Sequence, residues 1–266
     1  MPIKFKIKFK LKEPKPIEEF TPDRLHALFL SLFPEKIAEE FHKPARYRPF
    51  CIWFPEFFKS NQKDNLIKNF NLTISILKDE YFSPLLGNLV EKEKEKEFHL
   101  GDTRIITLPY SSSLIQQKAF TTYEELYDNA SSSPYFSFTF YTPVSFKKGK
   151  IDYPLPDPKI VFKSLIKKWN YFSPFKIDVD LREVIENKIA ISYLNLKSHK
   201  ITLSLGGKIT GFTGEVGYYV KDPTHQELKW LNTLGRFSIY SGLGRKTTMG
   251  LGMVKFECKD KDILYL

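Results

Sequence analysis

The sharpest local signal in this chain is residues 242–252, which read Gly242-Leu243-Gly244-Arg245-Lys246-Thr247-Thr248-Met249-Gly250-Leu251-Gly252. Two glycine pairs enclose a basic, hydroxyl-rich insert. Glycine accepts a positive φ and a close backbone approach, so loop amides and the insert's side chains can face a phosphate. No acidic residue occurs between Lys229 and Phe256, which makes the local potential positive. The pattern favours a clamp on an RNA backbone, and its alternative is a turn that serves tight packing alone.

Two common nucleotide-binding motifs are excluded by the surroundings of this loop. A P-loop needs Gly-Lys-Thr at a fixed spacing and a following helix, and both are missing. A Rossmann fingerprint also opens a helix, whereas this loop leads into a predicted strand at residues 253–257. We therefore interpret this loop as an RNA contact.

The composition favours a folded protein with an anionic partner. The chain has 266 residues, 42% of them hydrophobic, which suffices for one large domain or two small ones. Lys and Arg number 41 against 31 Asp and Glu, and the formal charge of +10 favours phosphate contacts. Cys51 and Cys258 stand alone, so no disulfide framework or paired zinc motif is present. Without a signal-peptide-like or membrane-length apolar run, we expect a cytoplasmic protein with no membrane partner.

The first half begins with a strand whose two faces differ in chemistry. Residues 3–11 alternate between apolar residues and lysine, which predicts a half-buried strand with one basic face. That lysine row fits a solvated face that resists aggregation, and it fits RNA contact equally well. Apolar spacing predicts a helix over residues 22–33. A second helical stretch should end near His42, because Pro44 disfavours helical backbone at the residue before it.

The second half repeats the same order of elements after a Ser-rich junction at residues 131–134. The pattern predicts a strand at 135–141, a helix at 159–169, strands at 189–196 and 200–205 around a Ser198-His199 turn, a strand at 211–220 and a helix at 224–234. Each half thus approximates strand, helix, strands, helix and strand. We predict the α+β class, with two tandem ferredoxin-like (RRM-like) domains at residues 1–130 and 131–266.

Several passages of the second half resemble one known family. The glycine-rich loop, entered through Leu234-Gly235-Arg236-Phe237 and Tyr240-Ser241, resembles the C-terminal signature of the CRISPR-associated endoribonucleases that process precursor guide RNA, the sixth of the Cas families within the RAMP superfamily. Matching passages are Tyr141 to Phe146, Leu165 to Asn170 with Phe172 and Pro174, and Gly211 to Gly214. The resemblance implies tandem ferredoxin-like domains and metal-independent cleavage of CRISPR repeat RNA, leaving 2′,3′-cyclic phosphate and 5′-hydroxyl ends.

The chemistry implied by the resemblance directs attention to histidines. Metal-free cleavage needs a base for the 2′-hydroxyl, an acid for the departing 5′-oxygen and cations for the phosphorane charge. In the family the catalytic histidine commonly follows the first helical region, where His42 stands among basic residues. We expect His42 to be the general acid or base, His26 its partner and Arg48 the cation. The alternative is that His42 is a capping or surface residue and that His26 only satisfies nearby backbone.

The predicted RNA contacts lie in two basic segments. They are Lys43, Arg46, Arg236, Gly242, Gly244, Arg245, Lys246, Thr247, Thr248, Gly250 and Gly252. No carboxylate pair or His-Cys cluster occurs at metal spacing nearby, so we expect neither metal nor cofactor. The implied partner is CRISPR repeat RNA, and a Cas effector complex or a second copy in a homodimer are further candidates. Two rivals remain open: a non-catalytic repeat-RNA-binding protein or effector-complex subunit, and a structural or protein-interaction module.

Overall fold

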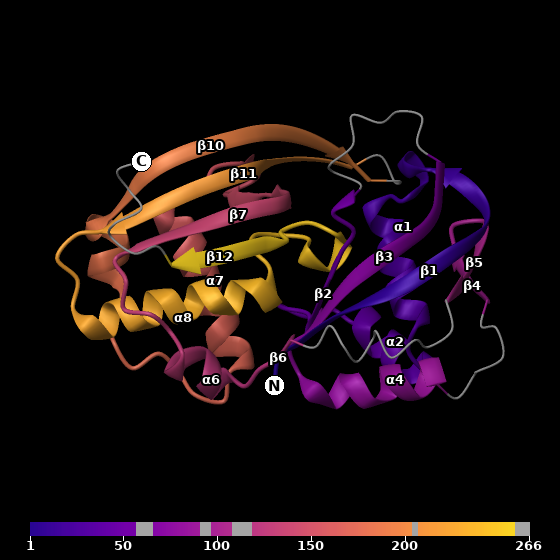
Figure 1. Cartoon of the computed structure of the whole chain (residues 1–266), viewed down its shortest axis with the longest axis horizontal. Coiled ribbons are helices and arrows are strands. Elements are labelled where there is room, and N and C mark those ends of the chain that lie inside the picture. Colours follow the sequence, from indigo (N-terminus) through magenta and orange to yellow (C-terminus); the bar gives the residue numbers. More distant parts are fainter. Residues whose placement is uncertain (57–65, 91–96, 108–118, 204–206, 259–266) are drawn as a thin grey trace. The chain divides into compact units, whose positions relative to one another are not determined.

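The chain forms two compact units in the computed structural model, which describes residues 1–56, 66–90, 97–107, 119–203 and 207–258 (Figure 1). Unit 1 consists of Met1–Phe120, Thr202–Lys208 and Lys246–Gly250. Unit 2 consists of Thr121–Ile201, Ile209–Arg245 and Leu251–Leu266. Part of the C-terminal loop is therefore a structural piece of unit 1. The predicted boundary between residues 130 and 131 stays a prediction.

Unit 1 is built on an antiparallel sheet with the strand order β2-β3-β1-β5-β4, and β6 also pairs with β1. Its strands are β1 Ile3–Pro16, β2 Phe50–Trp53, β3 Leu66–Ile76, β4 Glu97–Leu100, β5 Thr103–Thr107 and β6 Ala119–Phe120. The alternation in β1 buries its apolar residues from Ile3 to Leu11 and turns the lysines to the other face. The strand continues past the predicted end at residue 11, with a register shift between Lys10 and Lys15.

Among the described residues of unit 1, helices contribute the other layer: α1 Pro22–Ser31, α2 Glu35–His42 and α4 Phe82–Val90. In Figure 1, α1 and α2 lie behind the strands of this sheet. Pro22 occupies the first helical position of α1, where its missing N–H costs nothing. As predicted, α2 ends at His42, two residues before Pro44. The apolar sides of the helices and sheet share one aromatic core, so the two histidine-bearing helices have a rigid support.

Unit 2 contains a four-stranded antiparallel sheet with the order β10-β11-β7-β12 and a separate two-stranded ribbon, β8-β9. Its strands are β7 Tyr135–Val144, β8 Phe146–Lys148, β9 Ile151–Tyr153, β10 Ile189–Thr202, β11 Lys208–Val220 and β12 Val254–Cys258. Its helices are α6 Tyr123–Asp128, α7 Pro158–Phe172 and α8 His225–Ser241, with a π-helical turn at Val184–Lys188. Antiparallel sheets with helices in both units confirm the predicted α+β class and the ferredoxin-like halves.

The long helix α8 has a strong signal at each end. Thr224 and Glu227 form a capping box at its start, each side chain accepting from the other residue's backbone N–H. The helix runs seven residues beyond its predicted end at Leu234 and stops at Gly242, whose φ is 60°. Gly235 lies inside the helix, where a Cβ atom would overlap the Phe256 ring of β12. The glycine therefore permits close packing of helix on sheet.

The turn predicted at Ser198-His199 is wrong. Strand β10 runs unbroken from Ile189 to Thr202, and the hairpin closes later, where the Leu203 amide donates to the Gly207 carbonyl at 2.8 Å. The His199 ring bonds the Thr213 hydroxyl on β11 at 2.7 Å. Polar residues in the middle of this strand thus serve a cross-strand contact. Residues 204 and 205 of the predicted second strand lie outside the described residues.

Candidate active site

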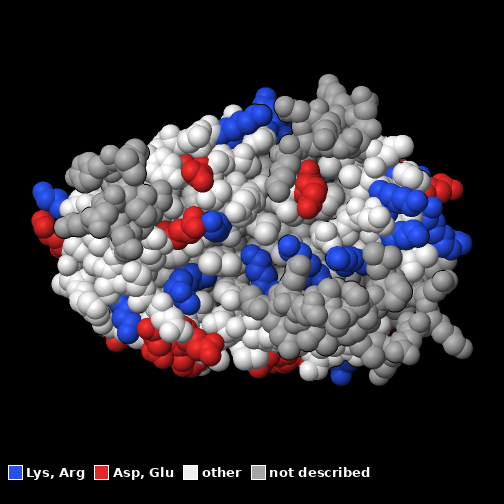
Figure 2. Space-filling model, viewed as in Figure 1, with Lys and Arg blue, Asp and Glu red and all other residues white. Residues whose placement is uncertain are grey.

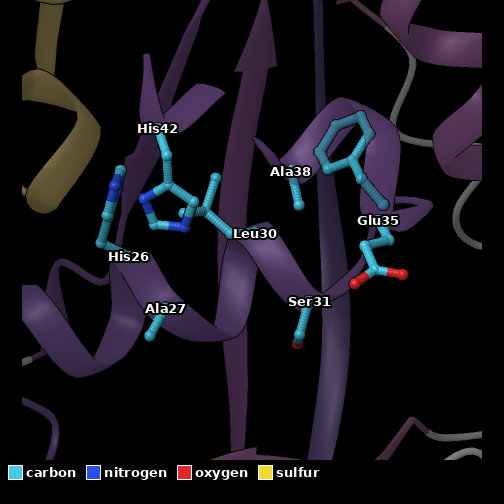
Figure 3. A pocket seen from close by; sticks show the side chains of 8 residues that line it. His26, Ala27, Leu30, Ser31, Glu35, Ala38 and His42 are labelled. Atoms are coloured by element: carbon cyan, nitrogen blue, oxygen red, sulfur yellow. The ribbon is translucent and has the colours of Figure 1, made fainter. Parts of the chain in front are cut away.

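Helices α1 and α2 enclose a pocket of about 420 Å³ in unit 1. It is lined by His26, Ala27, Leu30, Ser31, Phe33, Glu35, Ala38 and His42. His26 comes from α1 and His42 is the last residue of α2, and Figure 3 shows both imidazole rings at the same end of the pocket. The structure therefore brings together the two histidines that the sequence singled out.

His26 is held at the edge of the aromatic core. The neighbouring residues Leu25, Leu28 and Phe29 are buried, which fixes the rotation of α1 and leaves His26 at the boundary. Its ring is stacked with that of Phe50 on β2, with 5.8 Å between centroids. His42, in contrast, is exposed. The pair thus combines one constrained imidazole with one that is open to solvent.

A backbone carbonyl from the C-terminal loop fixes one nitrogen of His26. The Nδ1 atom lies 2.8 Å from the Thr248 carbonyl oxygen, which belongs to a 3-10 turn at Thr247–Met249. Burial lowers the pKa of His26 below its ordinary value of 6.5, whereas the Thr248 contact acts in the opposite direction. The positive charges of His42, Arg48 and Lys246 lower that pKa further. Together, burial and these charges favour the neutral form of the His26 imidazole.

The cations predicted beside the histidines differ in their surroundings. Arg48 is half-buried just before β2, and its charge acts on His26 together with that of Lys246. Lys43 and Arg46 are exposed between α2 and β2, and the Arg46 guanidinium lies over the Tyr47 ring at 5.7 Å. Arg48 and Lys246 are the cations whose charges reach His26, while Lys43 and Arg46 stay predicted RNA contacts.

Five backbone amides of the glycine-rich loop donate hydrogen bonds to carbonyls of the protein itself. The donors and acceptors are Gly242 N to Ser238 O, Leu243 N to Gly252 O, Arg245 N to Ser145 O, Met249 N to Lys246 O and Gly252 N to Pro143 O. Gly244 has a φ of 76°, and a Cβ atom there would overlap the Ser145 carbonyl. These bonds give the loop a fixed shape. Phosphate contact through those five amides would require the bonds to break, so side chains are the better candidates.

The comparisons with known proteins agree on one family. The family model described as CRISPR-associated endoribonuclease Cas6 matches residues 138–254. A CRISPR-associated endoribonuclease Cas6 of Streptococcus thermophilus is 25% identical over 193 residues, which cover 71% of this chain and 76% of that protein. A Thermus thermophilus Cas6, solved as a product complex, has a TM-score of 0.79 at 26% identity, covering 97% of this chain and 100% of that chain. The chain is thus similar in sequence and in fold to CRISPR-associated endoribonucleases of the Cas6 family. The resemblance drawn from the sequence motifs is thereby confirmed.

Arg245 is paired with an acid that sequence inspection did not single out. The Arg245 guanidinium lies 2.5 Å from the Asp152 carboxylate on β9. Asp152 also accepts from Lys147 at 3.1 Å and from the Thr210 amide at 3.1 Å. Lys246, one residue on, is exposed and has a left-handed φ of 60°. Of these two loop cations, Lys246 is the one available to an incoming phosphate without the loss of this ion pair.

Arg236 occupies a partly buried position on α8. Its Nε atom is buried and has no hydrogen-bond partner among the described residues. Burial raises the pKa of Tyr240, one turn later, while the Arg236 charge lowers it. The phosphate contact assigned to Arg236 stays a prediction, and it would supply a partner for this nitrogen.

The lysine row of β1 is only partly a solvated face. Lys6, Lys8 and Lys10 are exposed, and Figure 2 shows basic side chains where β1 and β3 run in Figure 1. Lys4 is different, because its ammonium lies 4.8 Å from the centre of the buried Trp53 ring. Burial lowers the pKa of Lys4 to about 8, Cys51 raises it and the Lys6 charge lowers it. Lys4 is therefore a packing residue. For Lys6, Lys8 and Lys10, both a solvated face that resists aggregation and RNA contact remain predictions.

Lys168 is a second residue that sequence inspection did not single out. Its ammonium is buried and donates to the carbonyls of Ser241 at 2.9 Å and Gly242 at 3.2 Å. It therefore binds the C-terminal end of α8, where the glycine-rich loop begins. The helical spacing could have identified Lys168 as buried. It stands three residues after Leu165 and four before Phe172, on the buried face of α7.

Two features are absent from the described parts of the chain. No group of three or more His, Cys, Asp and Glu side chains there has a metal-site arrangement. No helix there is long and apolar enough to cross a membrane.

Proposed function

We propose that this chain is an endoribonuclease that binds CRISPR repeat RNA and cleaves precursor CRISPR RNA within its repeats without a metal ion. The observation that supports this proposal most directly is that His26 and His42 line one pocket. The positive charges of Arg48 and Lys246 act on His26 there. A metal-free transesterification needs these groups: a base, an acid and cations for the phosphorane. The endoribonuclease names of the relatives agree with this assignment.

The neutral imidazole of His26 is the general base in this proposal. With Nδ1 bonded to the Thr248 carbonyl, Nε2 has a free lone pair that takes the proton of the 2′-hydroxyl. The 2′-oxygen then forms a bond to phosphorus, and the bond from phosphorus to the 5′-oxygen breaks. His42, in its protonated form, gives its proton to the departing 5′-oxygen. The products are a 2′,3′-cyclic phosphate and a 5′-hydroxyl, with no other reactant required.

The cations divide into two roles. Arg48 lies close enough for its charge to act on His26, so it can offset the negative charge that develops on the phosphorane. Lys246 is exposed and adjoins the turn that bonds His26, so it can bind the phosphate and bring the repeat to the pocket. Lys43 and Arg46, which are exposed near His42, extend the contact along the RNA backbone.

The test is incubation of the purified chain with repeat RNA in EDTA, beside the same RNA carrying a 2′-deoxy sugar at the scissile position. Cleavage of the unmodified RNA alone supports metal-independent attack by the 2′-hydroxyl. Binding of both RNAs without cleavage would replace the proposal with the non-catalytic RNA-binding protein. Loss of cleavage in EDTA would contradict metal independence.

The proposed mechanism needs one chain and one repeat. A homodimer or a Cas effector complex would add contacts outside the pocket, and light scattering of the chain with and without repeat RNA measures the mass of the assembly directly. A mass of one chain plus one RNA would contradict the homodimer.

A further inference from the structure

Histidine can act as a base only through a nitrogen that carries no proton, and its two ring nitrogens compete for that proton. A carbonyl oxygen accepts a hydrogen bond and cannot donate one. The 2.8 Å contact between the His26 Nδ1 and the Thr248 carbonyl therefore requires the proton on Nδ1. The bond stabilises one tautomer of the ring and leaves the Nε2 lone pair free.

The contact also fixes the orientation of the ring. The His26 ring is stacked with the Phe50 ring on β2. The hydrogen bond to the Thr248 carbonyl opposes rotation of the imidazole about the bond that joins it to Cβ. Both Thr248 and His26 belong to unit 1, although they are 222 residues apart in the chain. The ring is thus bound by a helix, a strand and a loop at once.

The turn that supplies the carbonyl is itself constrained. The Met249 amide donates to the Lys246 carbonyl at 2.9 Å, which closes the 3-10 turn. Left-handed residues border the turn on both sides, with φ of 60° at Lys246 and 91° at Gly250. Helical backbone at Thr248 directs its carbonyl along the turn axis, toward His26.

We propose that the turn Thr247–Met249 is the positioning element of the catalytic base: the Thr248 carbonyl holds His26 as its Nδ1–H tautomer and directs Nε2 to the reacting hydroxyl. The inference rests on the proposed function, and it gives the glycine-rich loop a task besides RNA contact. Because Lys246 adjoins the turn, an RNA phosphate bound there acts on the same backbone that orients the base. Binding of the repeat and alignment of the base are therefore linked through one segment.

The charges around His26 agree with a base that works in its neutral form. His42, Arg48 and Lys246 face the ring from α2, from the segment before β2 and from the loop, and each positive charge disfavours a second proton on the ring. The Thr248 carbonyl, in contrast, favours the protonated ring. The Thr248 carbonyl differs from the nearby charges because it determines which ring nitrogen of His26 carries the proton. The experiment therefore measures the tautomer of His26.

The test uses the full chain labelled with 15N-histidine and records the two-bond proton-nitrogen spectrum at alkaline pH. The His26 signals are assigned by their loss in His26→Asn. We expect the Nδ1–H tautomer in the wild-type chain, a measurement that needs no variant of the loop. An Nε2–H tautomer in the wild-type chain would overturn the proposal.

Met249→Pro tests the turn itself, since proline removes the amide that closes it and disfavours helical backbone at Thr248. The Thr248 carbonyl then rotates away from His26. We expect loss of the single tautomer and a single-turnover rate constant, at saturating protein, lower by about 100-fold. Met249→Ala keeps the amide and serves as the matched control, with the tautomer retained. A folded Met249→Pro chain with an unchanged tautomer would overturn the proposal.

The two measurements separate this inference from the proposed function. An Nδ1–H tautomer that depends on the turn, in a chain that cleaves no repeat RNA, would support the positioning contact and remove the catalytic role. Cleavage by a chain whose His26 is the Nε2–H tautomer would support the function and overturn the positioning element.

Discussion

Replacement of Lys168 with methionine tests what stabilises the end of α8. Methionine has a similar length and fills the same buried space, but it donates no hydrogen bond. In the variant the Ser241 carbonyl loses the ammonium at 2.9 Å, whereas the Gly242 carbonyl keeps the Ser241 hydroxyl at 3.0 Å. The last carbonyls of a helix have no partner within it, so this loss is not repaired by the helix itself.

The expected cost follows from two losses and one gain. Loss of a hydrogen bond from a charged donor costs about 1.5–3 kcal/mol. Removal of a positive charge from a helix C-terminus costs roughly 0.3–1 kcal/mol more. The variant gains because it no longer buries an ammonium, and this offsets part of the loss. We expect the free energy of unfolding to fall by about 2 kcal/mol, and at about 2–4 °C per kcal/mol the melting temperature falls by about 4–8 °C.

The assay is thermal unfolding followed by far-ultraviolet circular dichroism, with Lys167→Met as the matched control. Lys167 is the exposed neighbour of Lys168 on α7, and its replacement should change the free energy of unfolding by less than about 0.5 kcal/mol. If Lys168→Met melts at or above the wild-type temperature while the control is unchanged, the desolvation of the ammonium outweighs its bonds to the carbonyls. The stabilising role given to Lys168 would then be wrong.

Substitutions at three other positions test the pH dependence of cleavage, the salt dependence of RNA binding and the packing of α8. Cleavage should decline as the pH falls through the lowered pKa of His26, and Arg48→Gln removes a charge that lowers this pKa, so the decline should move to higher pH in single-turnover rates. An unchanged pH profile would contradict this. Lys246→Ala should weaken repeat-RNA binding and reduce the slope of log K against log salt by about one, measured by filter binding, and an unchanged slope argues against a phosphate contact. Gly235→Ala should destabilise the chain by about 1–3 kcal/mol in urea unfolding, because the added methyl meets the Phe256 ring, and equal stability would show that the helix shifts at no cost.

Local patterns predicted those parts of the fold that depend on neighbours in sequence. The alternation at residues 3–11 gave the burial of β1 correctly, and Pro44 marked the end of α2 at His42. The same local reasoning failed at Ser198-His199, where polar residues indicated a turn and the chain instead continues as a strand. There the His199 ring bonds a side chain on the next strand, and no local pattern carries that information.

The candidate site, like the fold, was predicted from the sequence only in part. Residue type and the family resemblance selected His26 and His42, and the structure places both in one pocket. Neither predicts the bond from His26 to the Thr248 carbonyl, because a carbonyl is present at every position and leaves no mark in the sequence. The partner of Arg245 was missed for a similar reason: Asp152 lies on a short ribbon with no motif around it.

The 222 residues between His26 and Thr248 have a consequence for the newly made chain. During synthesis the histidine pair leaves the ribosome long before the turn that orients one of them, and domains form from the N-terminal side first. Unit 1 can build its sheet and helices early, but it lacks Lys246–Gly250 until those residues are synthesised. A chain interrupted before that segment would have the pocket and both imidazoles without the aligned base. On the proposed function, such incomplete chains would cleave repeat RNA about 100-fold more slowly than chains that contain the turn.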